Sequence, residues 1–151
     1  ITDVTVYFWR LGGIMAIFGG LLWLSSEVIE ADVLTFVGLL IGGGFVMSVM
    51  SGMLYKIIPF LVWFHLNGMG YMNIPSMGEM VNKKMAMAQL LLFVLSIVLF
   101  ALSYWLEMMM KFGAGTLFLS MLLLEINLLL AFRNYGETCK RKPDFDLSGV
   151  K

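Results

Sequence analysis

Long apolar runs separated by short polar stretches dominate the pattern of this chain. The run from Val33 to Leu66 is the most informative, because Lys56 is its only charged residue. A straight helix over this run would reach about 50 Å at about 1.5 Å per residue, whereas the hydrocarbon core of a bilayer is about 30 Å thick. We therefore expect a membrane-spanning helix with an extension. We expect a bend or end near Pro59, since proline removes a helix donor and clashes with the carbonyl four residues back.

Three further apolar runs are each close to the length of about 20 residues that a helix needs to cross a bilayer. Backbone polar groups in lipid must be satisfied within their own segment, which favours helices over strands. The connections are short or contain Gly and Pro, so neighbouring helices are expected to be antiparallel. The predicted fold class is an all-α integral membrane protein with four transmembrane helices in an antiparallel bundle. The predicted segments are Tyr7 to Leu24, Val33 to Tyr55 with its extension to Leu66, Met85 to Leu106, and Ala114 to Phe132.

The distribution of Lys and Arg predicts the orientation. With four crossings, both termini and the middle loop lie on one side, and the positive-inside rule places that side in the cytoplasm. We therefore expect a protein of the cell (inner) membrane with both termini cytoplasmic. Residues 1–137 are the predicted transmembrane domain, and residues 138–151 are predicted to form a flexible cytoplasmic tail because they are polar and contain Pro143. The basic residues on the cytoplasmic side are Arg10, Lys56, Lys83, Lys84, Arg133, Lys140, Arg141, Lys142 and Lys151, and the other side has Lys111.

The composition supports the membrane assignment and excludes some partners. The chain is 60% hydrophobic and 13% charged, whereas a soluble domain is about 25% charged. Its formal net charge is zero, so no basic field indicates nucleic acid. Its single cysteine, Cys139, excludes an internal disulfide and a CxxC metal site. The expected partners are the lipid bilayer and other membrane subunits or copies of the same chain.

Polar residues inside the apolar runs are the main candidates for function. Glu125 lies inside the fourth run, where an ionised carboxylate costs about 2.5 kcal/mol or more unless it is paired. Arg10 and Lys56 enter the membrane from the same side, so an ion pair between Glu125 and one of them is expected. Such a pair would fix helix register; the alternative is a proton-relay or substrate carboxylate. Asn127 completes this predicted intramembrane polar network.

Small residues recur at intervals of four along the first two runs. This spacing lets helix backbones approach closely in lipid, where packing drives association. The ordinary interpretation is tight helix contact, and the functional alternative is a substrate path opened by a broken helix at Gly42-Gly43-Gly44. The predicted packing residues are Gly12, Ala16 and Gly20 on the first helix, and Gly38, Gly42, Gly44, Ser48 and Gly52 on the second.

His65 is the one histidine of the chain and is followed by Met69 and Met72. A neutral imidazole can bind haem iron, and thioethers are soft ligands for Cu(I), so haem and copper are the candidate cofactors. The ligand set is incomplete, however. The alternative is an interfacial histidine beside Trp63, with methionines that fill gaps in apolar packing.

The stretch Gly52-Met-Leu-Tyr-Lys-Ile-Ile-Pro-Phe-Leu-Val-Trp-Phe-His65, followed by Ile74-Pro-Ser-Met77, resembles a known family. It is similar to the C-terminal part of polytopic bacterial membrane proteins related to haem–copper oxidase subunit I. That superfamily binds haem and copper through several histidines, whereas this chain has one. The resemblance therefore implies a scaffold role beside a redox centre and carries over no catalytic ligand.

Two functions remain open from the sequence. The first is a non-catalytic membrane subunit, or C-terminal segment, of a larger respiratory or redox complex. The second is a piece of a transporter or channel with a polar path around Glu125, Asn127 and Lys56. The sequence contains no Walker, GxSxG or HExxH motif. It therefore shows no complete active site, and no enzymatic activity is assigned to it.

Overall fold

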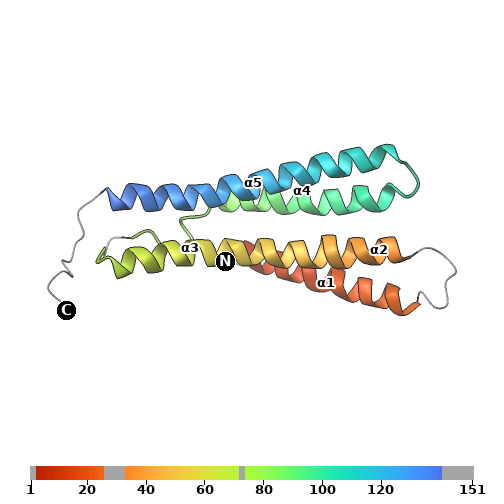
Figure 1. Cartoon of the computed structure of the whole chain (residues 1–151), viewed down its shortest axis with the longest axis horizontal. Helices are drawn as coiled ribbons and strands as arrows, with labels where there is room; N and C mark the ends of the chain where they lie inside the picture. Colours follow the sequence, from red (N-terminus) through yellow and green to blue (C-terminus); the bar gives the residue numbers. More distant parts are fainter. Residues whose placement is uncertain (1–2, 26–32, 72–73, 141–151) are drawn as a thin grey trace.

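The computed structural model describes residues 3–25, 33–71 and 74–140, and all of its regular elements are helical (Figure 1). Four helices in this part of the chain are long and apolar enough to cross a membrane, which confirms the prediction of an all-helical fold with four such helices. The elements are α1 (Val4–Ser25), α2 (Leu34–Gly38), the π-helix η1 (Leu39–Val46), α3 (Met47–Gly68), α4 (Lys83–Leu102) and α5 (Met108–Cys139).

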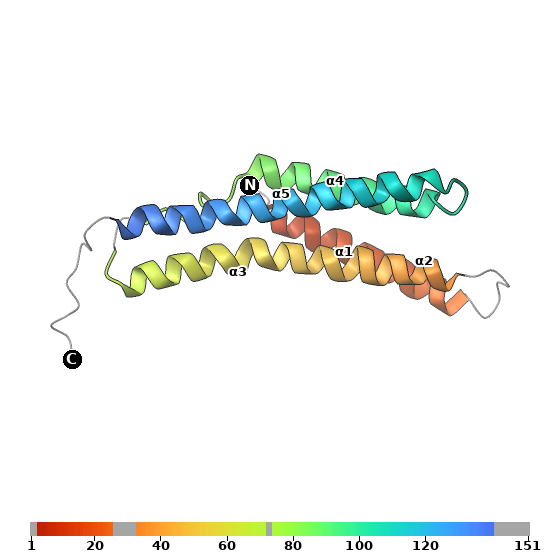
Figure 2. The same ribbon diagram turned by 45° about the horizontal axis from the view of Figure 1, so that its top comes forward.

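The second long helix is continuous from Leu34 to Gly68, although three elements make it up. Of the bend or end predicted near Pro59, the end is wrong, because α3 continues past the proline to Gly68 (Figure 2). The bend stays a prediction. Proline is tolerated in membrane helices where neighbouring groups surround the freed backbone, and Pro59 is fully buried. The irregularity lies instead in η1, whose eight residues adopt the wider π geometry around Gly43.

The other helix boundaries differ from the predicted ones by a few residues. Helix α4 ends at Leu102, and a tight turn leads from there into α5. Helix α5 starts earlier and ends later than predicted, and in its last turns Arg133 Nε donates to Glu137 Oε1 at 2.9 Å. Helix α5 therefore includes Thr138 and Cys139, which were predicted to be the first residues of the flexible tail. Residues 141–151 lie outside the described part of the chain.

The helices pack in two groups. In one group α1 packs against η1 and α3, and in the other α4 packs against α5. Helix α3 also packs against α5 and so joins the two groups. Both α3 and α5 continue well beyond the ends of α1 and α4 (Figures 1 and 2). The bundle therefore has a four-helix part and a two-helix extension.

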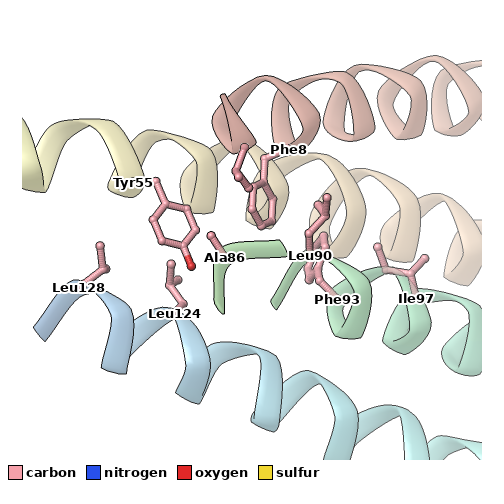
Figure 3. Packing of buried hydrophobic residues seen from close by; sticks show 9 residues of the cluster. Phe8, Tyr55, Ala86, Leu90, Phe93, Ile97, Leu124 and Leu128 are labelled. Carbon is pink, nitrogen blue, oxygen red and sulfur yellow. The ribbon is translucent and has the colours of Figure 1, made fainter. Parts of the chain in front are cut away.

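The main core lies in the four-helix part, where the buried Phe8 ring contacts two aromatic rings (Figure 3). Its centroid is 5.9 Å from that of Tyr55 and 6.5 Å from that of Phe93. These distances are typical of favourable aromatic pairs. The core therefore joins α1, α3 and α4, and Leu124 and Leu128 add α5.

A second, smaller core fills the two-helix extension. Val62 and Leu66 of α3 pack with Ala131 of α5, and the segment between α3 and α4 covers them with Tyr71 and Met80. All of these side chains are buried. The face of the extension that is covered by the segment between α3 and α4 is therefore well packed.

Candidate functional site

Glu125 does not lie where the sequence predicted. Its side chain is exposed, and it forms no ion pair within the described residues. Lys56 Nζ instead lies 3.8 Å from Asp3 Oδ2, and Arg10 is exposed. The prediction that Glu125 faces the protein and pairs with Arg10 or Lys56 therefore fails within this chain. Depth along a helix can be counted from sequence, but each residue turns the side chain by about 100°, and this decides what it faces.

Asn127 occupies the inward position that was expected for Glu125. It is fully buried, and its Oδ1 accepts from Asn82 N at 2.8 Å while its Nδ2 donates to Asn82 O at 3.0 Å. Asn82 is the N-cap of α4, and its own side chain accepts from the backbone N–H groups of Lys84 and Met85. Asn127 therefore fixes the start of α4 against α5. Within the described residues, no hydrogen bond or ion pair joins Glu125, Asn127 and Lys56, and the polar path around them stays a prediction.

His65 is exposed near the end of α3, with its ring centroid 5.7 Å from that of Tyr135 on α5. Met69 follows one turn later, where its N–H donates to the His65 carbonyl at 3.1 Å, and its side chain packs on the second core. Met72 lies outside the described residues. In the described chain, no group of three or more His, Cys, Asp and Glu side chains is placed to hold a metal ion. The ring contact with Tyr135 is the observed role of His65, and haem or copper binding stays a prediction.

The predicted packing residues divide into two sets. The set that meets α1 includes Gly44 and Gly52, where an added Cβ would lie 2.9 Å from Met15 and 2.7 Å from Trp9, respectively. Gly20, Gly38 and Gly42 have open space beside them, so the ridge that Gly38 and Gly42 form has no neighbour among the described residues. Ala16 is half-buried. The other members of the contacting set are Gly12, which faces Val49 and Phe45, and Ser48, whose Oγ donates to Phe8 O at 2.7 Å.

Two glycines outside the predicted set also lie close to a neighbouring helix. An added Cβ at Gly19 would lie 2.8 Å from Ile41, and one at Gly113 would lie 3.2 Å from Phe100. Gly19 comes seven residues after Gly12, which is about two helical turns. The spacing of four residues that joins Gly12, Ala16 and Gly20 does not include Gly19.

Two buried polar side chains also escaped the sequence analysis. Both amide atoms of Gln89 and the hydroxyl of Tyr55 are buried and form no hydrogen bond of good geometry, although the Tyr55 hydroxyl lies toward the Asn127 amide. Gln89 stands inside the apolar run of α4, and this is the signal that could have drawn attention to it.

A cavity of about 90 Å³ lies beside Tyr55, where the start of α1, the middle of α3 and the start of α4 meet. Its wall is mostly apolar, and three charged side chains surround it. The residues that line it are Asp3, Val4, Tyr55, Lys56, Met77, Gly78, Val81, Lys83 and Ala86.

No protein-family model, curated protein sequence or solved structure matches this chain.

Proposed function

We propose that this chain is a non-catalytic, membrane-embedded subunit or segment of a larger membrane complex, and that its two-helix extension is the contact with a partner. The observation that carries this proposal is the bare apolar surface of the extension. In this proposal the four long helices cross the cell membrane antiparallel to one another, with both termini in the cytoplasm.

Helix lengths indicate where the bilayer would lie. Helix α1 has 22 residues and α4 has 20, so they measure about 33 Å and about 30 Å, which matches the hydrocarbon core. The continuous helix from Leu34 has 35 residues and α5 has 32, so they measure about 52 Å and about 48 Å. A bilayer fitted to the short helices would leave about 20 Å of the long ones outside the hydrocarbon.

The part of the long helices beyond this bilayer still displays large apolar side chains. Phe64 is 63% exposed and Leu129 is 56% exposed. Apolar surface of this kind outside lipid marks a protein interaction site. The other exposed apolar residues of the extension are Ile57, Phe60 and Leu61 on α3, and Ile126 and Phe132 on α5.

Glu125 supports this interpretation, because it is exposed directly beside Ile126. A carboxylate near the membrane boundary costs free energy unless a cation or hydrogen-bond donor satisfies it. A basic or hydrogen-bonding residue of the partner would satisfy Glu125 and fix the register of the two proteins. The predicted ion pair would then be intermolecular.

Photo-crosslinking in the native membrane tests the proposal. A benzophenone amino acid placed at Phe64 should give one defined protein adduct, whereas the same group at Phe18, which is 60% exposed on α1, should react with lipid. Glu125→Lys should weaken the Phe64 adduct, and Glu125→Gln should retain more of it than Glu125→Leu. Lipid adducts alone from Phe64 would show that the extension has no protein partner.

Thiol labelling tests the proposed orientation. Cys139 in the native chain should be protected from a membrane-impermeant maleimide in intact cells. A cysteine at Glu107, between α4 and α5, should react in the Cys139→Ser background. The reverse labelling pattern would show that the orientation is wrong. An analogous cysteine at Ser26 would lie outside the described residues.

A further inference from the structure

The core of the four-helix part contains polar atoms without protein partners. Gln89 is 0% exposed, and both its Nε2 and its Oε1 form no hydrogen bond. The Tyr55 hydroxyl lies toward the Asn127 amide but also forms no hydrogen bond of good geometry. Nearly all buried polar side chains in folded proteins have a partner, and an exception needs an explanation. Together these atoms offer hydrogen-bond donors and acceptors, so they fit a small ligand that both donates and accepts.

The two side chains come from different helices, Tyr55 from α3 and Gln89 from α4. Figure 3 shows the Tyr55 hydroxyl turned toward Ala86 and Leu124. Gln89 lies one turn beyond Ala86 on α4, and helical side chains lean toward the N-terminus of their helix, so its amide extends back toward Ala86. Ser120 of α5 donates from its Oγ to Gln89 O at 3.0 Å, which holds α5 against the same turn.

The cavity described above borders Tyr55 and Ala86, the residue one turn before Gln89 on α4. Tyr55 and Ala86 form part of its wall, and Asp3, Lys56 and Lys83 surround it with charge. Its volume of about 90 Å³ is enough for several water molecules, because one bound water needs about 10–15 Å³ of such space. Charged groups at the membrane boundary would keep this entrance hydrated.

We propose that the Tyr55 hydroxyl and the Gln89 amide bind water at the inner end of this cavity, which makes the cavity a hydrated inlet into the bundle. Water donates and accepts at once, so it satisfies the two amide atoms of Gln89 and the hydroxyl of Tyr55. Further along α4, the buried rings of Phe8 and Phe93 pack with a centroid distance of 6.5 Å, and we expect the inlet to end before them. This site is independent of the partner contact proposed above.

Cysteine accessibility tests the inlet in the full chain, reconstituted in lipid nanodiscs, with Cys139→Ser as the background. Gln89→Cys is compared with Ser96→Cys, because Ser96 is also 0% exposed on α4 but lies beyond Phe93. The probe is the small polar reagent methanethiosulfonate ethylammonium. Since this reaction needs a hydrated thiolate, the cysteine at Gln89 should react at least about tenfold faster than that at Ser96. Equal rates would overturn the proposal.

A stability measurement serves as a second test, because the Gln89→Cys substitution could itself let water reach this position. Gln89→Met keeps the length of the side chain and removes both polar atoms. If the amide is bound to water, the substitution leaves the Tm unchanged or lowers it. If the amide is dry and unsatisfied, the apolar side chain fits better and the Tm rises. A raised Tm would therefore refute the bound water, whatever the labelling rates.

Discussion

Asn127 of α5 holds both backbone polar groups of Asn82, with a 2.8 Å hydrogen bond to its N–H and a 3.0 Å hydrogen bond to its carbonyl. Asn82 in turn caps α4 with its side chain. One buried amide thus links the start of α4 to the middle of α5. The segment that leads into α4 is positioned by this contact and by the packing of Met80 in the second core.

Asn127→Leu is expected to destabilise the fold strongly. The substitution removes two hydrogen bonds and leaves the Asn82 N–H without a partner, while the Asn82 carbonyl still accepts from Ala86 N at 3.0 Å. We therefore expect a loss of about 2–3 kcal/mol. Asn82→Ala removes only the exposed cap and should cost about 1 kcal/mol. Thermal or denaturant unfolding in detergent measures both variants. A cost for Asn127→Leu no larger than that for Asn82→Ala would contradict the linking role.

Ser48 and Ser51 form a matched pair on α3. Ser48 Oγ donates to Phe8 O of α1 at 2.7 Å, whereas Ser51 Oγ donates to Met47 O of its own helix at 2.8 Å. Interhelical hydrogen bonds in membranes contribute about 0.6 kcal/mol on average and up to about 1.7 kcal/mol. Ser48→Ala should therefore lower stability by about 1 kcal/mol, near the upper part of that range because the bond is buried and short. Ser51→Ala should have less effect in the same unfolding assay, and equal losses would argue against the interhelical bond.

Gly44 and Gly42 give a second matched pair. A Cβ at Gly44 would lie 2.9 Å from Met15, while one at Gly42 would meet nothing within 4 Å. Gly44→Ala should therefore cost about 1–3 kcal/mol through overpacking. Gly42→Ala should be neutral or stabilise the helix by up to about 1 kcal/mol, because alanine favours helix over glycine. If Gly42→Ala proves the more harmful in native membranes but not in detergent, the ridge of Gly38 and Gly42 contacts a partner there.

Glu79 should give a pH-dependent anchor in the segment between α3 and α4. The Ser76 N–H donates to Glu79 Oε2 at 2.9 Å, and this hydrogen bond, with the nearby Lys83 charge as a lesser cause, lowers the pKa of the Glu79 carboxyl from its ordinary 4.5. Since the folded pKa lies below the unfolded one, the stabilisation is present above the unfolded pKa and is lost as pH falls through the folded pKa. The Ser76 amide resonance should follow this titration in NMR spectra. Glu79→Gln should abolish the dependence, and an unchanged titration in that variant would assign it to another group.

The four long helices could be predicted from sequence because the length and polarity of a run determine whether it suits a bilayer. The neighbours of each side chain could not be predicted in the same way. Glu125 and Asn127 lie at similar depth, yet one is exposed and the other is fully buried. Which of them points inward depends on the rotation of α5 against α3 and α4, and that rotation comes from packing.

Helix ends and buried neutral residues show the same limit. Pro59 is a strong local signal for a bend or break, but the surrounding core keeps the helix intact to Gly68. Gln89 carries no charge, so the cost of its burial is less evident in the sequence than that of Glu125. The irregularity in η1 had a visible signal in three consecutive glycines, but their effect on hydrogen bonding could not be read from composition.

The π geometry of η1 also affects how the long helix should be compared with any other helix. A π turn holds more residues than an α turn, so the directions of side chains before Leu39 and after Val46 do not follow one periodicity. A helical wheel drawn from Leu34 therefore misplaces every residue of α3, including Gly52 and Tyr55. Deleting one residue within η1 would return the stretch toward α geometry and turn these two faces relative to each other. In this helix, adding or removing a single residue therefore changes the direction in which the side chains at one end point relative to those at the other end.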